Sequence, residues 1–166
     1  MMRLKVLQFA AIVLTALALV PGGAHLFELP NKIGLSQEEY FTVQAIYHGW
    51  EWFGIVLMAA LAANISLAIV LRDQRWPFRL ALAAFIIIAV NLVIFFTWTY
   101  PANQATSNWM IVHANWRGLR TQWECSHAVN AVLMFVALCV VTLAVVLAKP
   151  TAAACSSNRD TAPRGH

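Results

Sequence analysis

The sequence contains few charged residues. Only 11% of its 166 residues are Asp, Glu, Lys or Arg, whereas 61% are hydrophobic. Soluble domains usually carry about 25% charged residues, so the composition argues against a soluble domain and predicts one domain surrounded by lipid. The net charge of +4 does not indicate a nucleic-acid partner, because the basic residues form no patch and lie at the ends of apolar runs.

Cysteine and short catalytic motifs are also scarce. The three cysteines, Cys125, Cys139 and Cys155, show no Cys-x-x-Cys or zinc-finger spacing. No internal repeat, phosphate-binding loop or nucleophile elbow is present, which argues against a solenoid, a P-loop protein and an α/β-hydrolase. Cys139 lies inside an apolar run and is best explained by packing, whereas Cys125 lies beside candidate site residues.

Long apolar runs dominate the rest of the chain. A helix needs about 20 mostly apolar residues to cross a bilayer. Four windows qualify, at roughly 4–26, 50–71, 80–100 and 128–147. We therefore predict an all-α integral membrane four-helix bundle over residues 1–150, followed by a disordered cytoplasmic tail at 151–166. The segment Pro21–Gly23 interrupts the first window, which predicts a kink or an end there and close approach of a neighbouring helix.

Two polar segments lengthen these helices on one side of the membrane. Ser36 and Glu39 have the spacing of a capping box, so a helix is expected to begin there and to run without a break to Leu71. A second helix is expected to extend outward from Asn115 into the fourth span. The segment from Pro101 to His113 between them has the composition of a loop.

Lysine and arginine are distributed unevenly about the apolar windows. Eight lie beside one set of span ends: Arg3, Lys5, Arg72, Arg75, Arg79, Lys149, Arg159 and Arg164. Three lie beside the other set: Lys32, Arg117 and Arg120. Because Lys and Arg favour the cytoplasmic side, we predict that both termini are cytoplasmic in the cell (inner) membrane and that the two extended segments are extracytoplasmic. The first window also resembles a signal peptide, whose cleavage after Ala24 would leave His25 as the first residue.

Three His/Glu pairs occur at the extracytoplasmic ends of the predicted helices. They are His25 with Glu28, His48 with Glu51, and Glu124 with His127. Residues three apart lie on one helix face, and the predicted topology sorts the six side chains by depth. The deeper layer contains His25, Glu51 and His127. The shallower layer contains Glu28, His48 and Glu124. Ionisable groups within a membrane bundle are costly and typical of functional sites.

The two layers have the chemistry of a transition-metal site. Two His and one carboxylate form the ligand set of non-haem iron oxygenases and also suit zinc or copper. Both layers together resemble the dinuclear sites of four-helix bundles, with one more His and one fewer Glu. The alternatives are a b-type haem with His25 and His127 as axial ligands, or a non-enzymatic carrier or accessory subunit that binds protons or a cation. Each group alone is also compatible with simple solvation, with Glu124 neutralised by Arg120.

Other polar and aromatic residues extend this candidate site. The candidate catalytic residues are Arg120, Tyr47 and Asn103. The candidate substrate-binding residues are Trp50, Trp116, Trp123 and Arg117. The tryptophans suit a flat, lipophilic substrate that arrives from the bilayer, and they equally fit an interfacial belt. The two arginines could fix an anionic or phenolate group or neutralise carboxylates. A homo-oligomer and a partner membrane subunit both remain open.

Two stretches of the chain resemble a known family. YPANQ (Tyr100–Gln104) and WRGLRTQWECSH (Trp116–His127) resemble a family of small four-span membrane proteins of unknown function that includes the fungal anthrone oxygenases. The matching positions are Pro101, Asn103, Trp116, Arg120, Trp123 and His127. The resemblance implies an oxygenase that acts on a polycyclic phenolic compound in part of the family. Together with the predicted ligands, it leads us to expect a metal-dependent membrane oxidoreductase, an oxygenase in particular, with iron as the metal.

Overall fold

The computed structural model describes residues 2–149, and within this range every regular element is helical. In chain order the elements are α1 (Met2–Lys32), α2 (Gln37–Gln44), η1 (Ala45–Tyr47), η2 (Trp50–Trp52), α3 (Phe53–Val70), α4 (Arg75–Ile94), η3 (Phe95–Thr99), α5 (Tyr100–Ala105) and α6 (Trp116–Leu147). Four stretches are long and apolar enough to cross a membrane: Met2–Lys32, Trp50–Val70, Arg75–Ala105 and Trp116–Leu147. The prediction of an all-helical chain with four such helices is therefore confirmed for the described residues. The predicted tail at 151–166 lies outside them.

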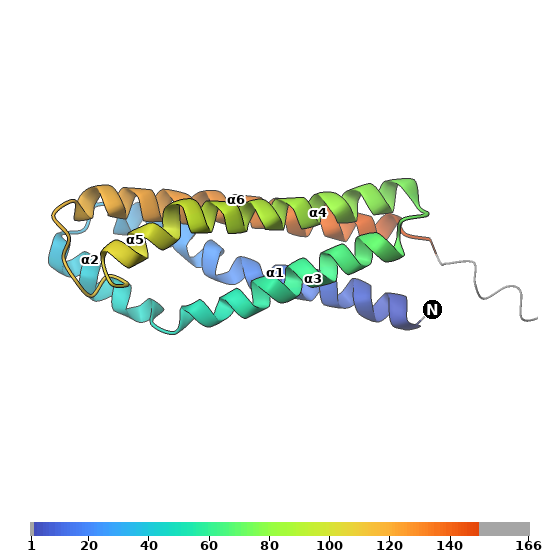
Figure 1. The fold of residues 1–166 in the computed structure, drawn as a ribbon, viewed down its shortest axis with the longest axis horizontal. Helices are drawn as coiled ribbons and strands as arrows, with labels where there is room; N and C mark the ends of the chain where they lie inside the picture. Colours follow the sequence, from blue (N-terminus) through green and yellow to red (C-terminus); the bar gives the residue numbers. More distant parts are fainter. Residues whose placement is uncertain (1, 150–166) are drawn as a thin grey trace, which may run out of the picture.

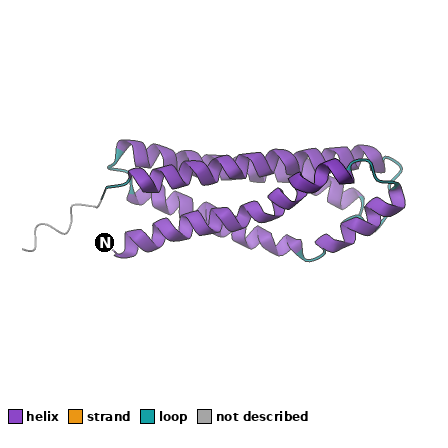
Figure 2. Ribbon diagram, turned by 180° about the vertical axis from the view of Figure 1, so that it is seen from behind, coloured by secondary structure: helices purple, strands orange, loops and turns teal. Residues whose placement is uncertain are grey.

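The four long helices run side by side along the molecule (Figure 1). α1 packs against α3 and α6, and α4 packs against the same two helices. α2 and α5 lie at one end, which we call the α2/α5 end, whereas the N-terminus and the last turn of α6 lie at the other. Seen from behind, helices again make up nearly the whole chain and are joined by short loops (Figure 2).

Small residues occupy the centre between the helices and allow close packing. The buried alanines of the four long helices include Ala11, Ala63, Ala81 and Ala144. A close approach lies at Gly22, where a Cβ atom would be 3.3 Å from the Cα atom of Ala131 on α6. The absence of a side chain at Gly22 thus lets two backbones touch, as the sequence predicted. α1 does not end at Pro21, however, and continues to Lys32.

The capping box at Ser36 is confirmed, but the long unbroken helix after it is wrong. The Ser36 hydroxyl accepts a hydrogen bond from the Glu39 backbone N–H, and the Glu39 carboxylate accepts one from the Ser36 N–H. These hydrogen bonds lower the pKa of Glu39. α2 ends at Gln44 and is followed by two short 3-10 turns, η1 and η2. Between them Gly49 adopts a φ of +90°, a left-handed conformation that glycine accepts readily and that changes the direction of the chain.

The segment after the third apolar window is more helical than the sequence predicted. α4 continues through the π-helical turn η3 into α5, which contains Pro101 at its start. The loop therefore begins after Ala105 rather than at Pro101, and the π-helical turn directly before Pro101 accommodates a residue that lacks a backbone N–H. Ser107, Asn108 and Trp109 then have φ values of 48°, 55° and 64°. This tight left-handed turn returns the chain over the α2/α5 end, where the side chain of Trp109 is buried.

Candidate functional site

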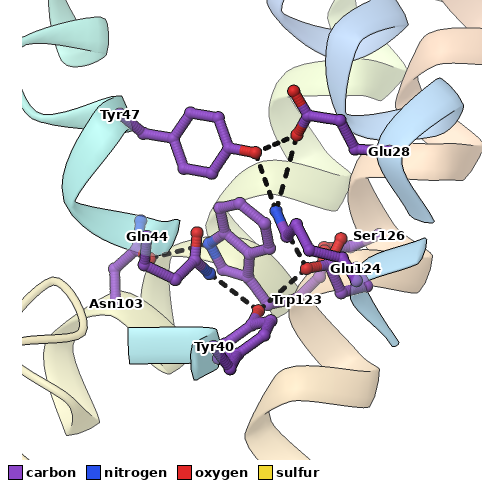
Figure 3. A network of polar contacts seen from close by, with 9 residues as sticks. Glu28, Tyr40, Gln44, Tyr47, Asn103, Trp123, Glu124 and Ser126 are labelled. Carbon is purple, nitrogen blue, oxygen red and sulfur yellow. Dashed lines mark hydrogen bonds and ion pairs between the residues drawn. The ribbon is translucent and has the colours of Figure 1, made fainter. Parts of the chain in front are cut away.

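A buried lysine lies at the centre of the polar groups at the α2/α5 end. Lys32, in the last turn of α1, is only 3% exposed. Its Nζ atom lies 3.1 Å from Glu124 Oε1 and 3.8 Å from Glu28 Oε2, and it donates a hydrogen bond of 2.9 Å to the Tyr47 hydroxyl. Figure 3 shows Glu28 and Tyr47 on one side of this network and Glu124 on the other. One ammonium group therefore joins two carboxylates from different helices.

Two tyrosines donate hydrogen bonds to the carboxylates. The Tyr40 hydroxyl donates to Glu124 Oε1 over 2.9 Å and accepts from Gln44 Nε2 over 2.7 Å. The Tyr47 hydroxyl donates to Glu28 Oε2. Burial, and then the neighbouring carboxylates, raise the pKa of both tyrosines above the ordinary value. Both side chains therefore remain neutral phenols that donate to Glu124 and Glu28.

A pair of imidazole rings lies beside this network. The ring centroids of His25 and His127 are 4.3 Å apart, and His25 is buried. Trp123 covers both rings, with its centroid 4.7 Å from that of His25 and 4.2 Å from that of His127. Within the described residues, His25 Nδ1 and Glu124 Oε2 are buried atoms without a hydrogen-bond partner. Each can accept a proton.

Trp123 is the side chain that connects the two parts of the site. The Lys32 Nζ atom lies 4.9 Å from the centroid of its ring and 4.4 Å from that of Tyr47, distances at which an ammonium group is attracted to an aromatic face. The indole Nε1 of Trp123 donates a hydrogen bond of 2.8 Å to Asn103 Oδ1 (Figure 3). Asn103, predicted as a catalytic residue, thus holds the tryptophan that lies against Lys32 and both histidines.

The remaining predicted rim residues lie around this centre. Arg120 donates to the backbone oxygen of Leu35 over 2.8 Å and stacks on Trp116, with its guanidinium carbon 4.8 Å from the ring centroid. The guanidinium carbon of Arg117, which is exposed, lies 5.2 Å from the centroid of the same ring. Trp50 lies against His25, with centroids 5.7 Å apart. The cation paired with Glu124 is therefore Lys32, and Arg120 instead fixes the segment that follows α1.

Two of the six predicted ligands lie away from the others. His48 and Glu51 are exposed, because α2 ends before them and Gly49 turns the chain between them. The expected deeper layer therefore lacks Glu51, and the expected shallower layer lacks His48. Among residues 2–149, no group of three or more His, Cys, Asp or Glu side chains is placed to hold a metal ion together. The structure brings together His25, Glu28, Glu124 and His127, and metal binding by them stays a prediction.

The sequence contained a signal for the residue that our predictions missed. Lys32 was counted only as a charge that reports orientation. It follows His25 by seven residues and Glu28 by four, a spacing that puts all three on one face of a helix. Tyr40 similarly precedes Gln44 by one helical turn. The pairing of Lys32 with Glu124 could not be read from the sequence, since it joins opposite parts of the chain.

Comparison of the chain with protein-family models, curated proteins and solved structures gives no match. The resemblance to the family of the anthrone oxygenases therefore stays a prediction from Tyr100–Gln104 and Trp116–His127. The features of the molecule that bear on function are the buried charges, the paired imidazoles and their surroundings.

Proposed function

We propose that this chain is a small multi-pass membrane protein that binds and releases protons at the buried cluster of Lys32, Glu28 and Glu124, as a carrier or accessory subunit. The observation that carries the proposal is the burial of Lys32 between two carboxylates at the ends of two apolar helices. Ionisable groups in such positions are expensive and are typical of proton relays and ion pathways.

The balance of charge in the cluster favours proton uptake. Lys32 supplies one positive charge for two carboxylates, and Glu124, the more deeply buried of the two, keeps an oxygen without a partner. A buried charge that is incompletely paired costs several kcal/mol, and binding of a proton removes that cost. The ammonium group also lies between the carboxylates that a second metal ion would need, so this part of the site suits a proton better than a dinuclear centre.

The proposal includes the placement of the chain in the membrane. The four apolar helices form a bundle that crosses the cell (inner) membrane, with both termini cytoplasmic and the α2/α5 end extracytoplasmic, as the distribution of Lys and Arg favours. In a variant without native cysteines, an impermeant thiol reagent added to intact cells is expected to label Asn108→Cys and not Asp73→Cys. The reverse pattern would contradict this orientation.

Infrared difference spectroscopy tests whether the cluster binds a proton. The purified protein in lipid is titrated with acid, and the carboxylic acid C=O band is followed. We expect an uptake band that is reduced by Glu124→Gln and that persists in Glu51→Gln, because Glu51 lies outside the network. Proteoliposomes with an enclosed pH dye then show whether the proton is transported or only bound. Absence of a band that depends on Glu124 would refute the proposal.

A metal-dependent oxidoreductase, in particular an oxygenase of a lipophilic aromatic substrate, is the second candidate. It is favoured by the His25 and His127 rings, whose centroids are 4.3 Å apart, because two imidazoles are part of the ligand set of non-haem iron sites. Metal analysis of the purified protein distinguishes iron, zinc and copper, and a visible spectrum detects haem. We expect His127→Ala to lose the metal and His113→Ala, in the outer loop, to retain it. A metal-free parent protein would exclude this candidate.

A further inference from the structure

The polar cluster is a continuous series of hydrogen-bonded groups that runs from partly exposed to fully buried. The Glu28 side chain is 36% exposed, that of Lys32 is 4% exposed and that of Glu124 is 0% exposed. Tyr47 bridges the first two, because its hydroxyl accepts from Lys32 Nζ and donates to Glu28 Oε2. Every member of this series can lose and regain a proton.

The series has one branch, which does not reach solvent. Glu124 also accepts from Tyr40, whose hydroxyl accepts in turn from Gln44. Gln44 is buried, and its Oε1 atom has no partner within the described residues. An amide cannot pass a proton as an acid or a base near neutral pH, so the branch ends there. Within the described residues, Lys32 and Tyr47 are the groups of the cluster that connect Glu124 with Glu28, the partly exposed acid.

We propose that Tyr47 and Lys32 form a proton wire between the buried carboxylate of Glu124 and the partly exposed carboxylate of Glu28. Glu28 is the port to the outer solution, and Glu124 is the buried acceptor. This inference rests on the proposed function, since it assigns the route to the proton-binding cluster. It is carried by the hydrogen-bond partners and by the gradient of exposure from Glu28 to Glu124.

Release of a proton follows the observed direction of the hydrogen bonds. Lys32 Nζ gives a proton to the Tyr47 oxygen while the Tyr47 hydroxyl gives its own proton to Glu28. Lys32 is then a neutral amine and Glu28 a carboxylic acid, with Tyr47 unchanged. Protonated Glu124 next gives its proton to Lys32, which restores the ammonium group, and Glu28 gives a proton to water. The net result is transfer of one proton from Glu124 to solvent, with every bond that breaks matched by one that forms.

Uptake is the reverse sequence and requires the Tyr47 hydroxyl to turn from Glu28 towards Lys32. Tyr47 lies in the one-turn helix η1, next to the turn of the chain at His48 and Gly49, and is only half-buried. The titratable and charged groups that surround the wire are Glu28 and His25 on α1, Tyr40 on α2, and Arg120 and His127 on α6. Of these, only Glu28 is both hydrogen-bonded to Tyr47 and open to solvent.

Two substitutions interrupt the wire without removing its charges. Tyr47→Phe keeps the ring that packs on His25 and Trp50 and removes the hydroxyl. Lys32→Arg keeps a positive charge beside Glu124, and arginine does not deprotonate in proteins. Tyr40→Phe is the matched control, since it removes a tyrosine hydroxyl that donates to Glu124 from the closed branch. Circular dichroism and gel filtration confirm that each variant is folded.

The experiment measures the rate at which Glu124 gains a proton after a rapid pH jump. Acid is released by a light pulse, and the Glu124 band is followed by time-resolved infrared spectroscopy of the protein in lipid vesicles. We expect Tyr47→Phe and Lys32→Arg to slow protonation by about 100-fold, the scale of a lost proton-transfer group. We expect Tyr40→Phe to protonate at nearly the parent rate, and Tyr47→Phe to reach the parent amplitude at long times.

The outcomes separate the wire from the function on which it rests. Parent-like rates in both Tyr47→Phe and Lys32→Arg would overturn the wire and leave proton binding intact. Slow protonation in Tyr40→Phe with normal protonation in Tyr47→Phe would overturn it as well, because the route would then use the other branch. Absence of a Glu124 band in the parent protein would overturn both the wire and the proposed function.

Discussion

Replacement of Lys32 by methionine tests the energetic role of the buried ammonium group most directly. Methionine has a comparable length and no charge, so Lys32→Met leaves the carboxylate of Glu124 buried without its cation. At 3.1 Å and an effective dielectric constant of about 20, the lost attraction amounts to about 5 kcal/mol. Glu28 contributes less, because it is partly exposed and solvent screens its charge.

Part of this attraction is offset in the parent protein by the cost of burying Lys32 itself. Removal of one partner from a buried ion pair typically destabilises a protein by about 3–5 kcal/mol, and we expect a loss in this range at neutral pH. The double variant Lys32→Met/Glu124→Gln removes both charges and keeps an acceptor for Tyr40. We therefore expect it to recover most of the lost stability.

Reversible unfolding in mixed detergent micelles, followed by far-UV circular dichroism, measures these free energies. Protonation of Glu124 removes the unpaired charge in Lys32→Met, so the folded state of this variant holds more protons than the unfolded state. Its stability then rises as the pH is lowered, and its deficit relative to the parent shrinks. A deficit below about 1 kcal/mol at neutral pH, the size of an exposed ion pair, would refute the view that Lys32 neutralises a buried charge.

Three further predictions concern packing, backbone conformation and pH. Gly22→Val is expected to lower the free energy of unfolding by about 1–3 kcal/mol through the contact of α1 with α6, whereas Gly23→Val, which meets no atom within 4 Å, should be nearly neutral in the same unfolding assay. Gly49→Ala should cost about 1–2 kcal/mol because of its left-handed φ, and an unchanged unfolding midpoint would contradict this. The raised pKa of Tyr40 and Tyr47 stabilises the folded state below about pH 10, the ordinary tyrosine value, and this contribution is lost as the pH rises above it. Because both side chains stay neutral in the folded protein near pH 10, the variant Tyr40→Phe/Tyr47→Phe should show the same tyrosinate absorbance at that pH as the parent.

The local features of the fold could be predicted from the sequence. The four apolar windows identified the four long helices, the capping box at Ser36 fixed the start of α2, and Gly22 predicted a close helix contact. The errors lie where local rules compete. α1 continues past Pro21, where an end was one of the two expected outcomes. Gly49 interrupts a segment that contains no proline and was expected to be one helix. These outcomes depend on a few kcal/mol of tertiary packing, which local propensity does not contain.

The candidate site could be predicted in part. The spacing of His25 with Glu28 and of Glu124 with His127 identified four side chains that the structure brings to one end of the molecule. His48 and Glu51 have the same spacing and are exposed, because Gly49, in a left-handed conformation, turns the chain between them. Two residues three positions apart show which helix face they share, but they do not show which other element packs against that face.

The sequence by itself determined that this protein is helical, that four of its helices are apolar enough to cross a membrane, and that its titratable groups lie near the helix ends. These properties follow from composition and periodicity, which act over a few neighbouring residues. Only the tertiary structure decided that Lys32 is buried between Glu28 and Glu124, and that Tyr47 and Tyr40 donate to different carboxylates. Ion pairing falls off within a few ångströms, so the partners of Lys32 are set by how α1, α2 and α6 pack together.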